Sequence, residues 1–177
     1  MADISETRAQ TIKLLLDGYS SLSVPTLLAV LSPRFKHRVL PASLEMPVHD
    51  VKSFADHAAG IFALFDAFRL VPEHAYEDDA QGVMVIHARM EGTLKNKGGP
   101  WRNECIMMVR LSDTGEEVDE ICEFVDSAKA IEMRRKHAPK NFMVGGAGGG
   151  ELARIGNVLL FAGLAAGAFF GVRRLLQ

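Results

Sequence analysis

The chain has 177 residues, of which 48% are hydrophobic and 24% charged, and its net charge is −2. This size and balance fit one globular domain with an appendage, and they exclude a disordered or collagen-like chain. The near-neutral charge offers no basic surface to a phosphate backbone, so nucleic acid is not an expected partner. Cys105 and Cys122 lie in apolar runs without a Cys-x-x-Cys motif, which indicates neither a disulfide framework nor a zinc site.

The first part of the chain predicts three helices around one strand. Apolar residues at helical spacing predict a helix over residues 3–18. Ser23 is the expected N-cap of a short second helix, which Pro33 is expected to end. A strand over residues 34–41 follows, and Asp50 begins a third helix with a broad apolar face.

The second part changes to the period-two pattern of strands. Turn-forming residues separate four runs that we expect to be consecutive antiparallel strands, over residues 68–76, 82–94, 101–111 and 116–125. A last helix over residues 127–140 is capped by Asp126 or Ser127. The order α-α-β-α-β-β-β-β-α indicates an α+β fold, a cone-shaped curved antiparallel sheet wrapped around helices, with a cavity in its mouth.

The C-terminal residues form a separate expected unit. Residues 155–172 contain no charge and one amide, Asn157, and eighteen helical residues reach roughly 27 Å, close to the thickness of a hydrocarbon core. We therefore expect residues 154–177 to be a single-pass transmembrane anchor that keeps the body in the cytoplasm. The alternative is an amphipathic helix packed on the body. A Gly-rich linker over residues 141–153 separates the anchor from a domain of residues 1–140.

Two segments of the body resemble a known superfamily. The sequence GYSSLSVPTLLAVLSPRFKHRVLP resembles the opening of nuclear transport factor 2-like, SnoaL-like domains, and EVDEICEFVDSAKA resembles their closing strand. The match covers about residues 5–138. With LPASLEMPVHD, HAAGIFALFDAF and WRNEC, the chain looks most like small proteins of fungal secondary-metabolite clusters. Members there include isomerases, cyclases and a pinacolase that act on terpenoid, polyketide and alkaloid intermediates without a cofactor.

This resemblance implies a cofactor-independent isomerase or cyclase that acts by proton transfer on a hydrophobic small molecule. A hydratase, epoxide hydrolase or dehydratase would use the same pocket, and the fold also serves non-enzymatic binding modules. No metal-ligand spacing is present, so no metal is expected. Many members dimerise through the outer face of the sheet, which implies a homodimer, and Gly163, Gly167 and Gly171 could add helix pairing in the membrane.

The first candidate catalytic residues lie on two neighbouring expected strands. Arg102 and Glu104 are two residues apart and so share one face of their strand, and antiparallel pairing could bring Glu123 close to Glu104. Limonene epoxide hydrolases of this superfamily carry a similar acidic–Arg–acidic triad. The resemblance implies that Glu104 or Glu123 is a catalytic base, whereas a structural salt bridge across the sheet is the alternative.

A second group of candidates comprises His37, Arg38 and His57. Strand alternation allows only one of His37 and Arg38 to face the cavity. Superposition on the steroid-isomerase branch favours Arg38, as support for an oxyanion, whereas the LPASL resemblance favours His37. The same superposition puts Leu40 and Leu16 where that branch has its catalytic Asp and Tyr, so that mechanism is not inherited. His57 lies beside the apolar face of the third helix and could act as an acid or base, or be structural.

Overall fold

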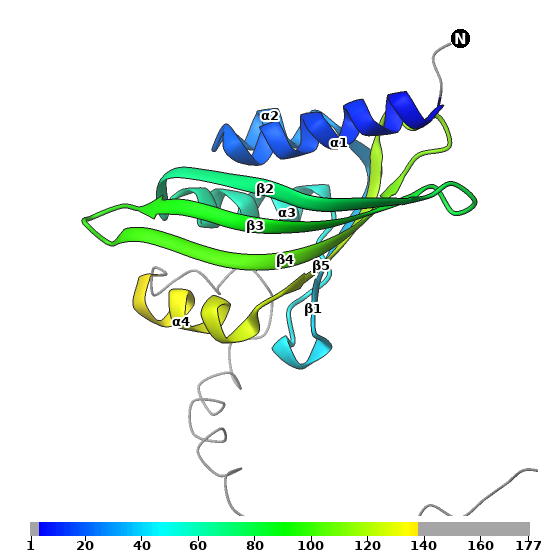
Figure 1. Ribbon diagram of the computed structural model, residues 1–177. Coiled ribbons are helices and arrows are strands. Elements are labelled where there is room, and N and C mark those ends of the chain that lie inside the picture. The colour runs from blue at the N-terminus through cyan, green and yellow to red at the C-terminus, as the bar shows by residue number, and fades with distance from the viewer. Residues whose placement is uncertain (1–3, 138–177) are drawn as a thin grey trace, which may run out of the picture. The chain divides into compact units, whose positions relative to one another are not determined.

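A computed structural model describes residues 4–137, which fold into one five-stranded sheet with helices packed around it (Figure 1). In chain order the elements are α1 (Ile4–Ser20), α2 (Val24–Leu28), β1 (Leu31–Leu40), the short 3-10 helix η1 (Ala42–Leu44), α3 (Val51–Phe62), β2 (Phe65–Asp78), β3 (Val83–Leu94), β4 (Gly99–Leu111), β5 (Val118–Val125) and α4 (Ser127–His137). The expected α+β order of the body is confirmed. The expected transmembrane helix lies outside the described residues, and none of the helices within 4–137 is long and apolar enough to cross a membrane.

The strands follow the order β1-β5-β4-β3-β2 across the sheet. All neighbouring strands are antiparallel except β1 and β5, which are parallel. The expectation of a wholly antiparallel sheet is therefore wrong at this edge. The reason is that α3 and three strands separate β1 from β5, so no hairpin imposes an antiparallel pairing. Figure 1 shows α3 behind β2 and β3, and α1 with α2 along the edge above them.

Helix starts follow the expected capping residues. The Ser23 side chain caps α2, Asp50 and Ser53 form a reciprocal capping box at α3, and Asp126 accepts a hydrogen bond of 3.0 Å from the Ala128 backbone N–H. Pro33 does not end a helix, because α2 already ends at Leu28. Instead Pro33 lies within β1, an edge strand on which a missing N–H is tolerated.

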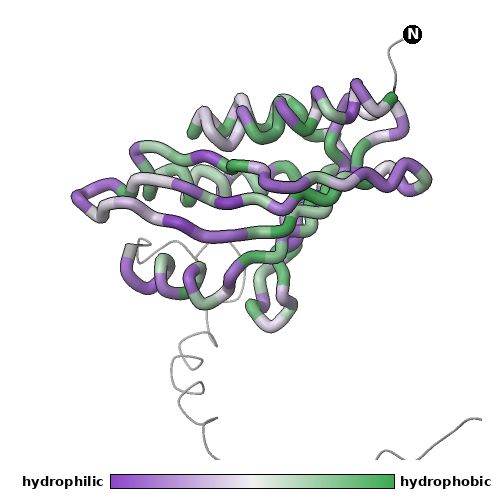
Figure 2. Tube along the Cα trace, in the orientation of Figure 1, coloured by the Kyte–Doolittle hydropathy of each residue, from purple (hydrophilic) through white to green (hydrophobic). Residues whose placement is uncertain are grey.

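Strand alternation decides which side chains reach the interior. Along β4, Asn103, Cys105 and Met107 are buried, whereas Arg102 and Glu104 are exposed. Figure 2 shows hydrophilic and hydrophobic stretches along the long strands, so burial, and not hydropathy alone, distinguishes the two faces of the sheet. The inner face packs against α1, α2 and α3 around a core that includes Phe35, Phe54 and Ile121, and the outer face carries most of the charges.

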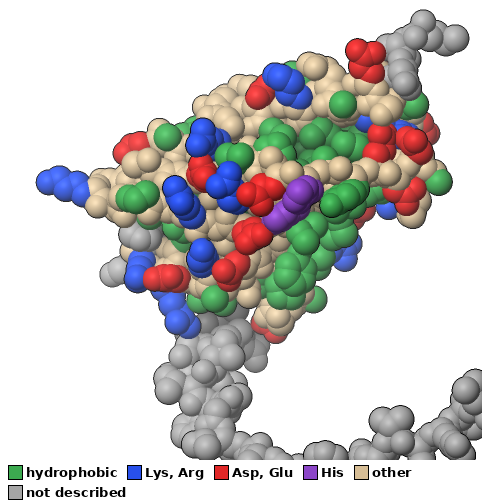
Figure 3. All heavy atoms as spheres, viewed as in Figure 1, with side chains coloured by type: hydrophobic (Ala, Val, Ile, Leu, Met, Phe, Trp, Pro, Cys, Tyr) green, Lys and Arg blue, Asp and Glu red, His purple; other side chains and the backbone are tan. Residues whose placement is uncertain are grey.

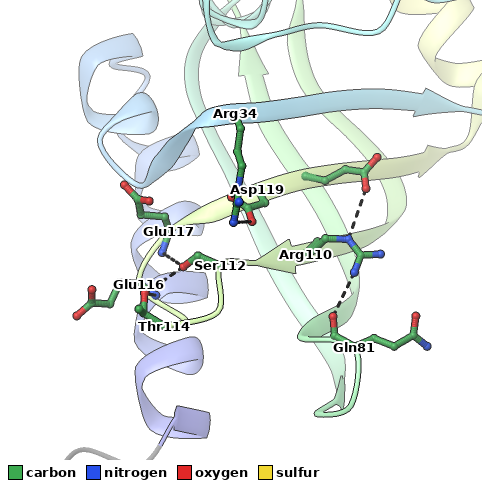
Figure 4. Close-up of polar contacts among 9 residues, drawn as sticks. Arg34, Gln81, Arg110, Ser112, Thr114, Glu116, Glu117 and Asp119 are labelled. Atoms are coloured by element: carbon green, nitrogen blue, oxygen red, sulfur yellow. Dashed lines mark hydrogen bonds and ion pairs between the residues drawn. The ribbon is translucent and has the colours of Figure 1, made fainter.

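The turn between β4 and β5 is fixed by side-chain hydrogen bonds (Figure 4). The Ser112 hydroxyl accepts a hydrogen bond of 3.2 Å from the Glu117 backbone N–H, and Gly115 takes a left-handed conformation with φ +77°. Beyond the turn, Arg34 of β1 donates hydrogen bonds of 3.0 and 2.7 Å to the two carboxylate oxygens of Asp119 on β5. These contacts set the register in which β5 lies between β1 and β4.

Candidate active site

A cavity of about 160 Å³ is lined by all five strands and by residues of α1, η1, α3 and α4. Most of its wall is apolar. One side is aromatic: the ring of Phe65 lies with its centroid 5.1 Å from that of Phe68 and 5.4 Å from that of Trp101. Five residues contribute polar side chains to the lining: Tyr19, His37, His57, Asn103 and Glu123.

Glu123 supplies the carboxylate of this cavity. It lies on β5 between Val39 of β1 and Met107 of β4, on the face of the strand that also buries Ile121 and Val125. Its side chain is only 14% exposed, and one carboxylate oxygen lies 3.4 Å from Nε2 of His37. A carboxylate with few water contacts and one imidazole neighbour is positioned to exchange a proton with a bound molecule.

Three histidines meet beside this carboxylate. The backbones of His37 in β1 and His49 before α3 exchange two hydrogen bonds, of 2.8 and 2.9 Å. His57 lies in α3, and its ring centroid is 5.6 Å from that of His37 and 4.8 Å from that of His49. Burial lowers the pKa of His57 to about 3, and that of His49 also falls through burial, with neighbouring imidazoles adding to both shifts. Both rings are therefore uncharged at neutral pH.

Tyr19 and Asn103 were not among the residues predicted from the sequence. Burial raises the pKa of Tyr19 well above its ordinary value, and the charge of Glu123 adds to the rise, so the phenol keeps its proton and can donate a hydrogen bond. Asn103 is buried, and its side-chain oxygen accepts a hydrogen bond of 2.9 Å from the Glu104 backbone N–H. Strand alternation puts Arg102 and Glu104 on one face of β4 and Trp101 and Asn103 on the other. This alternation was the sequence signal that could have identified Asn103 as a residue of the inner face.

The structure places His37 inside and Arg38 outside. His37 is 1% exposed, whereas the Arg38 side chain lies on the outer face, 4.0 Å from a carboxylate oxygen of Glu120. The expectation that Arg38 supports an oxyanion in the cavity is therefore wrong. Buried and exposed residues alternate from Phe35 to Arg38, and His37 pairs with the buried Ile121 of β5, which places His37 on the inner face and Arg38 on the outer one. His57 lines the cavity, as expected of a candidate acid or base.

The expected acidic–Arg–acidic triad does not form. Glu123 lies opposite Met107, so Glu104, three residues away from Met107, points to the other face of the sheet. There Glu104 is hydrogen-bonded to Nε2 of His87, and Arg102 lies across from Glu91 of β3. Figure 3 shows this outer face, where acidic, basic and histidine side chains gather over the long strands. Arg102 and Glu104 are thus surface residues.

The chain is similar in sequence to curated fungal proteins at low identity. No protein-family model matches the chain. A curated monooxygenase of Claviceps purpurea (strain 20.1) is 24% identical over 136 residues, which is 77% of this chain and 85% of that protein. The monooxygenase nsrS of Aspergillus novofumigatus is 26% identical over 70% of this chain and 83% of its own length. Austinoid biosynthesis cluster protein F of Aspergillus calidoustus is 24% identical, over 82% of this chain and 83% of its own length.

The solved structures settle the architecture. The BvnE pinacolase of Penicillium brevicompactum superposes with a TM-score of 0.70 at 14% identity, over 76% of this chain and 93% of its own. A protein of Jannaschia described as a SnoaL-like polyketide cyclase gives a TM-score of 0.61 at 16% identity, over 78% of this chain and 98% of its own. The chain has the SnoaL-like fold. AusH of Aspergillus nidulans, with a TM-score of 0.65 at 20% identity over 76% of this chain and 97% of its own, shares this SnoaL-like architecture.

Proposed function

We propose that this protein is an isomerase or cyclase that moves a proton within a hydrophobic secondary-metabolite intermediate of the terpenoid or polyketide class. The observation that carries the proposal is Glu123, which is the one carboxylate among the described residues that line the cavity. A carboxylate in a pocket lined mostly by apolar side chains can take a proton from a bound carbon acid with little competition from water. The pinacolase and the polyketide cyclase among the structural neighbours support this class of reaction.

The proposed reaction uses three side chains. Glu123 removes a proton from a carbon next to a substrate carbonyl, and His37, 3.4 Å away, orients the carboxylate. Tyr19, held in its protonated form, donates a hydrogen bond to the oxygen on which negative charge develops. The protonated Glu123 then returns the proton at a second carbon, so proton and charge balance without a co-reactant. Arg38, Arg102 and Glu104 take no part, since they lie on the outer face.

The cavity wall supports a hydrophobic substrate. Phe65, Phe68 and Trp101 form an aromatic surface, and Met46 and Met90 add adaptable side chains. A sugar or nucleotide would leave many hydroxyl or phosphate groups without partners against this wall.

The test begins with the natural substrate. Deleting the coding sequence in the producing organism should cause one intermediate to accumulate, and the purified protein should convert that compound. Replacing Glu123 by Gln should lower turnover by a factor of about 10² to 10⁴. The matched control is Glu104→Gln, the same chemical change on the outer face of the neighbouring strand, which should retain full turnover. A fully active Glu123→Gln enzyme would rule out the proposed base.

Isotopes separate the alternatives that share this pocket. In deuterated water, the product of an isomerase or cyclase gains at most deuterium bound to carbon. The product of a hydratase or epoxide hydrolase instead gains an oxygen atom from labelled water. A dehydratase instead releases one molecule of water from its substrate. Tight binding of the accumulated compound without any turnover would indicate a binding module.

A second candidate function is oxygenation of such a substrate by molecular oxygen, in which the substrate itself supplies the electrons that reduce the second oxygen atom to water. It is favoured by the names of two curated relatives, both called monooxygenases. Conversion under labelled oxygen gas distinguishes it, because only this reaction transfers label from the gas to the product.

We propose further that residues 154–177 anchor the protein to a membrane with the body in the cytoplasm. The support is the uncharged run over residues 155–172, which is followed by Arg173 and Arg174. In a flotation assay the full chain should rise with lipid vesicles, whereas a chain ending at residue 153 should stay at the bottom. A full chain that stays at the bottom would contradict the anchor.

A further inference from the structure

Two of the three histidines beside the cavity each have one buried ring nitrogen without a hydrogen-bond partner among the described residues. His37 is 1% and His49 8% exposed, and among the described residues neither Nδ1 of His37 nor Nε2 of His49 has a hydrogen-bond partner. A buried polar atom without a partner costs free energy, so two such atoms in one cluster call for an explanation. The candidate ring nitrogens of His37, His49 and His57 all lie within 4.8 Å of one another.

The other ring nitrogen of His37 shows how the cluster is oriented. Nε2 of His37 lies 3.4 Å from the Glu123 carboxylate, which leaves Nδ1 directed elsewhere. Histidines that bind metal ions commonly place the second nitrogen against a carboxylate in this way, which fixes the ring and makes the first nitrogen more basic. Glu123 thus lies in the position of a carboxylate that hydrogen-bonds the second nitrogen of a metal-binding histidine.

A second group of candidate metal ligands lies on the outer face, and its histidine has carboxylate neighbours at both ring nitrogens. Glu73, His87 and Glu104 are also close together. Both nitrogens of His87 already face carboxylates, at 3.7 Å for Glu73 and 2.5 Å for Glu104, and Glu104 is 65% exposed. This outer group is a network of surface ion pairs with no unpartnered buried atom.

We propose that His37, His49 and His57 form a binding site for a divalent transition-metal ion such as Zn²⁺, with Glu123 as the carboxylate that supports His37. Imidazole nitrogens suit zinc, and three of them leave a fourth coordination position for water or a ligand. Nitrogen ligands of a tetrahedral zinc ion lie about 3.3 Å apart. The nitrogens now lie within 4.8 Å of one another, and the rings of His49 and His57 are stacked with an interplanar angle of 22°. Binding of the ion therefore requires these rings to rotate until their in-plane lone pairs meet at one point. The proposal does not depend on the reaction proposed for the cavity.

The experiment uses the full chain, without an affinity tag and freed of metal by a chelator. Titration with Co²⁺ should produce the visible absorption bands of a four-coordinate ion, saturating at one ion per chain, and Zn²⁺ should abolish them. Zn²⁺ should also raise the thermal unfolding temperature, because an ion that binds only the folded state stabilises it. The absence of a saturable band would overturn the proposal.

Variants test which residues bind the ion. His49→Gln and His57→Gln should each weaken binding by at least about tenfold, and Glu123→Gln by about tenfold or more through its effect on His37. His87→Gln, the matched change in the outer group, should bind Co²⁺ as the unaltered chain does. Circular dichroism checks that each variant is folded. Unchanged binding in folded His49→Gln and His57→Gln, or loss in His87→Gln, would overturn the assignment. Because the readout needs no substrate, this result is independent of whether Glu123 acts as a catalytic base.

Discussion

Glu104 and Glu123 show how far position alone separates two identical side chains. They lie on adjacent strands of one sheet, yet Glu104 is 65% and Glu123 14% exposed. Glu123 pairs with Met107 of β4, and Glu104 lies three residues before Met107. Because successive side chains on a strand point to opposite faces, Glu104 points to the face opposite to that of Glu123. The chemical identity of a residue therefore predicts a candidate, and only the register makes it part of the cavity.

Tyr19 leads to a prediction for alkaline pH. Its pKa is raised in the folded protein, so above pH about 10 the unfolded chain releases a proton that the folded protein keeps. Stability that is fully present below that pH should fall as pH rises further. In a Tyr76→Phe variant, where Tyr19 is the one remaining tyrosine, phenolate absorbance and loss of circular dichroism should rise together. Phenolate that forms near pH 10 in a still folded protein would contradict the burial of this hydroxyl.

At the scale of elements, features that depend on residues close in sequence were predictable, and contacts between distant segments were less so. Caps at Ser23, Asp50 and Asp126 and the alternation of four strands were readable because each depends on residues close in sequence. The meeting of His37, His49 and His57 was not readable. These residues come from a strand, a loop and a helix, and their spacing matches no ligand motif.

The capping box of α3 gives a test of this local reasoning. The Asp50 side chain accepts a hydrogen bond of 2.9 Å from the Ser53 backbone N–H, and the Ser53 hydroxyl accepts one of 3.0 Å from the Asp50 backbone N–H. Asp50→Ala should lower the unfolding temperature by roughly 3 °C, measured by calorimetry, because it removes the cap. Asp50→Asn keeps an acceptor and should cost much less. Equal losses in both variants would mean that charge, and not capping, matters here.

Gly92 offers a prediction about packing between β2 and β3. A Cβ atom at this position would come within 2.6 Å of the Phe65 ring and 3.0 Å of the Ala67 carbonyl oxygen. Gly92→Ala should therefore reduce the free energy of unfolding by about 1–3 kcal/mol, measured in urea, because the aromatic wall must shift. Thr93→Ala, at the exposed neighbouring position, is the control and should change it little. A Gly92→Ala protein of unchanged stability would show that Phe65 moves freely.

At the scale of the whole molecule, the order of helices and strands in the body was predictable, but the strand pairing at the β1 edge of the sheet was not. Consecutive strands pair through short turns, so their order followed from the sequence. The parallel contact of β1 with β5 joins residues 84 to 87 positions apart in the chain, and no local pattern encodes such a pairing. The dimer remains a prediction, and so does the anchor.

The outer face of the sheet allows the dimer to be tested. Ile106 and Phe124 form a cross-strand pair on this face, and they are 44% and 48% exposed. If the body pairs through this face, Ile106→Lys should weaken dimerisation at least about tenfold, since it places a charge in an apolar contact. Light scattering after size-exclusion chromatography measures the mass. Leu14→Lys, an equally exposed change on α1, is the control; a dimer unaffected by Ile106→Lys would place the contact elsewhere.

The location of Glu123 on one wall of the cavity has a stereochemical consequence. A substrate whose hydrophobic surface rests against Phe65, Phe68 and Trp101 presents a single face to the carboxylate on β5. If Glu123 acts as the proposed base, a proton that it removes and returns stays on that face, and the product forms with one handedness. Each new stereocentre would record which side of the molecule had faced the sheet.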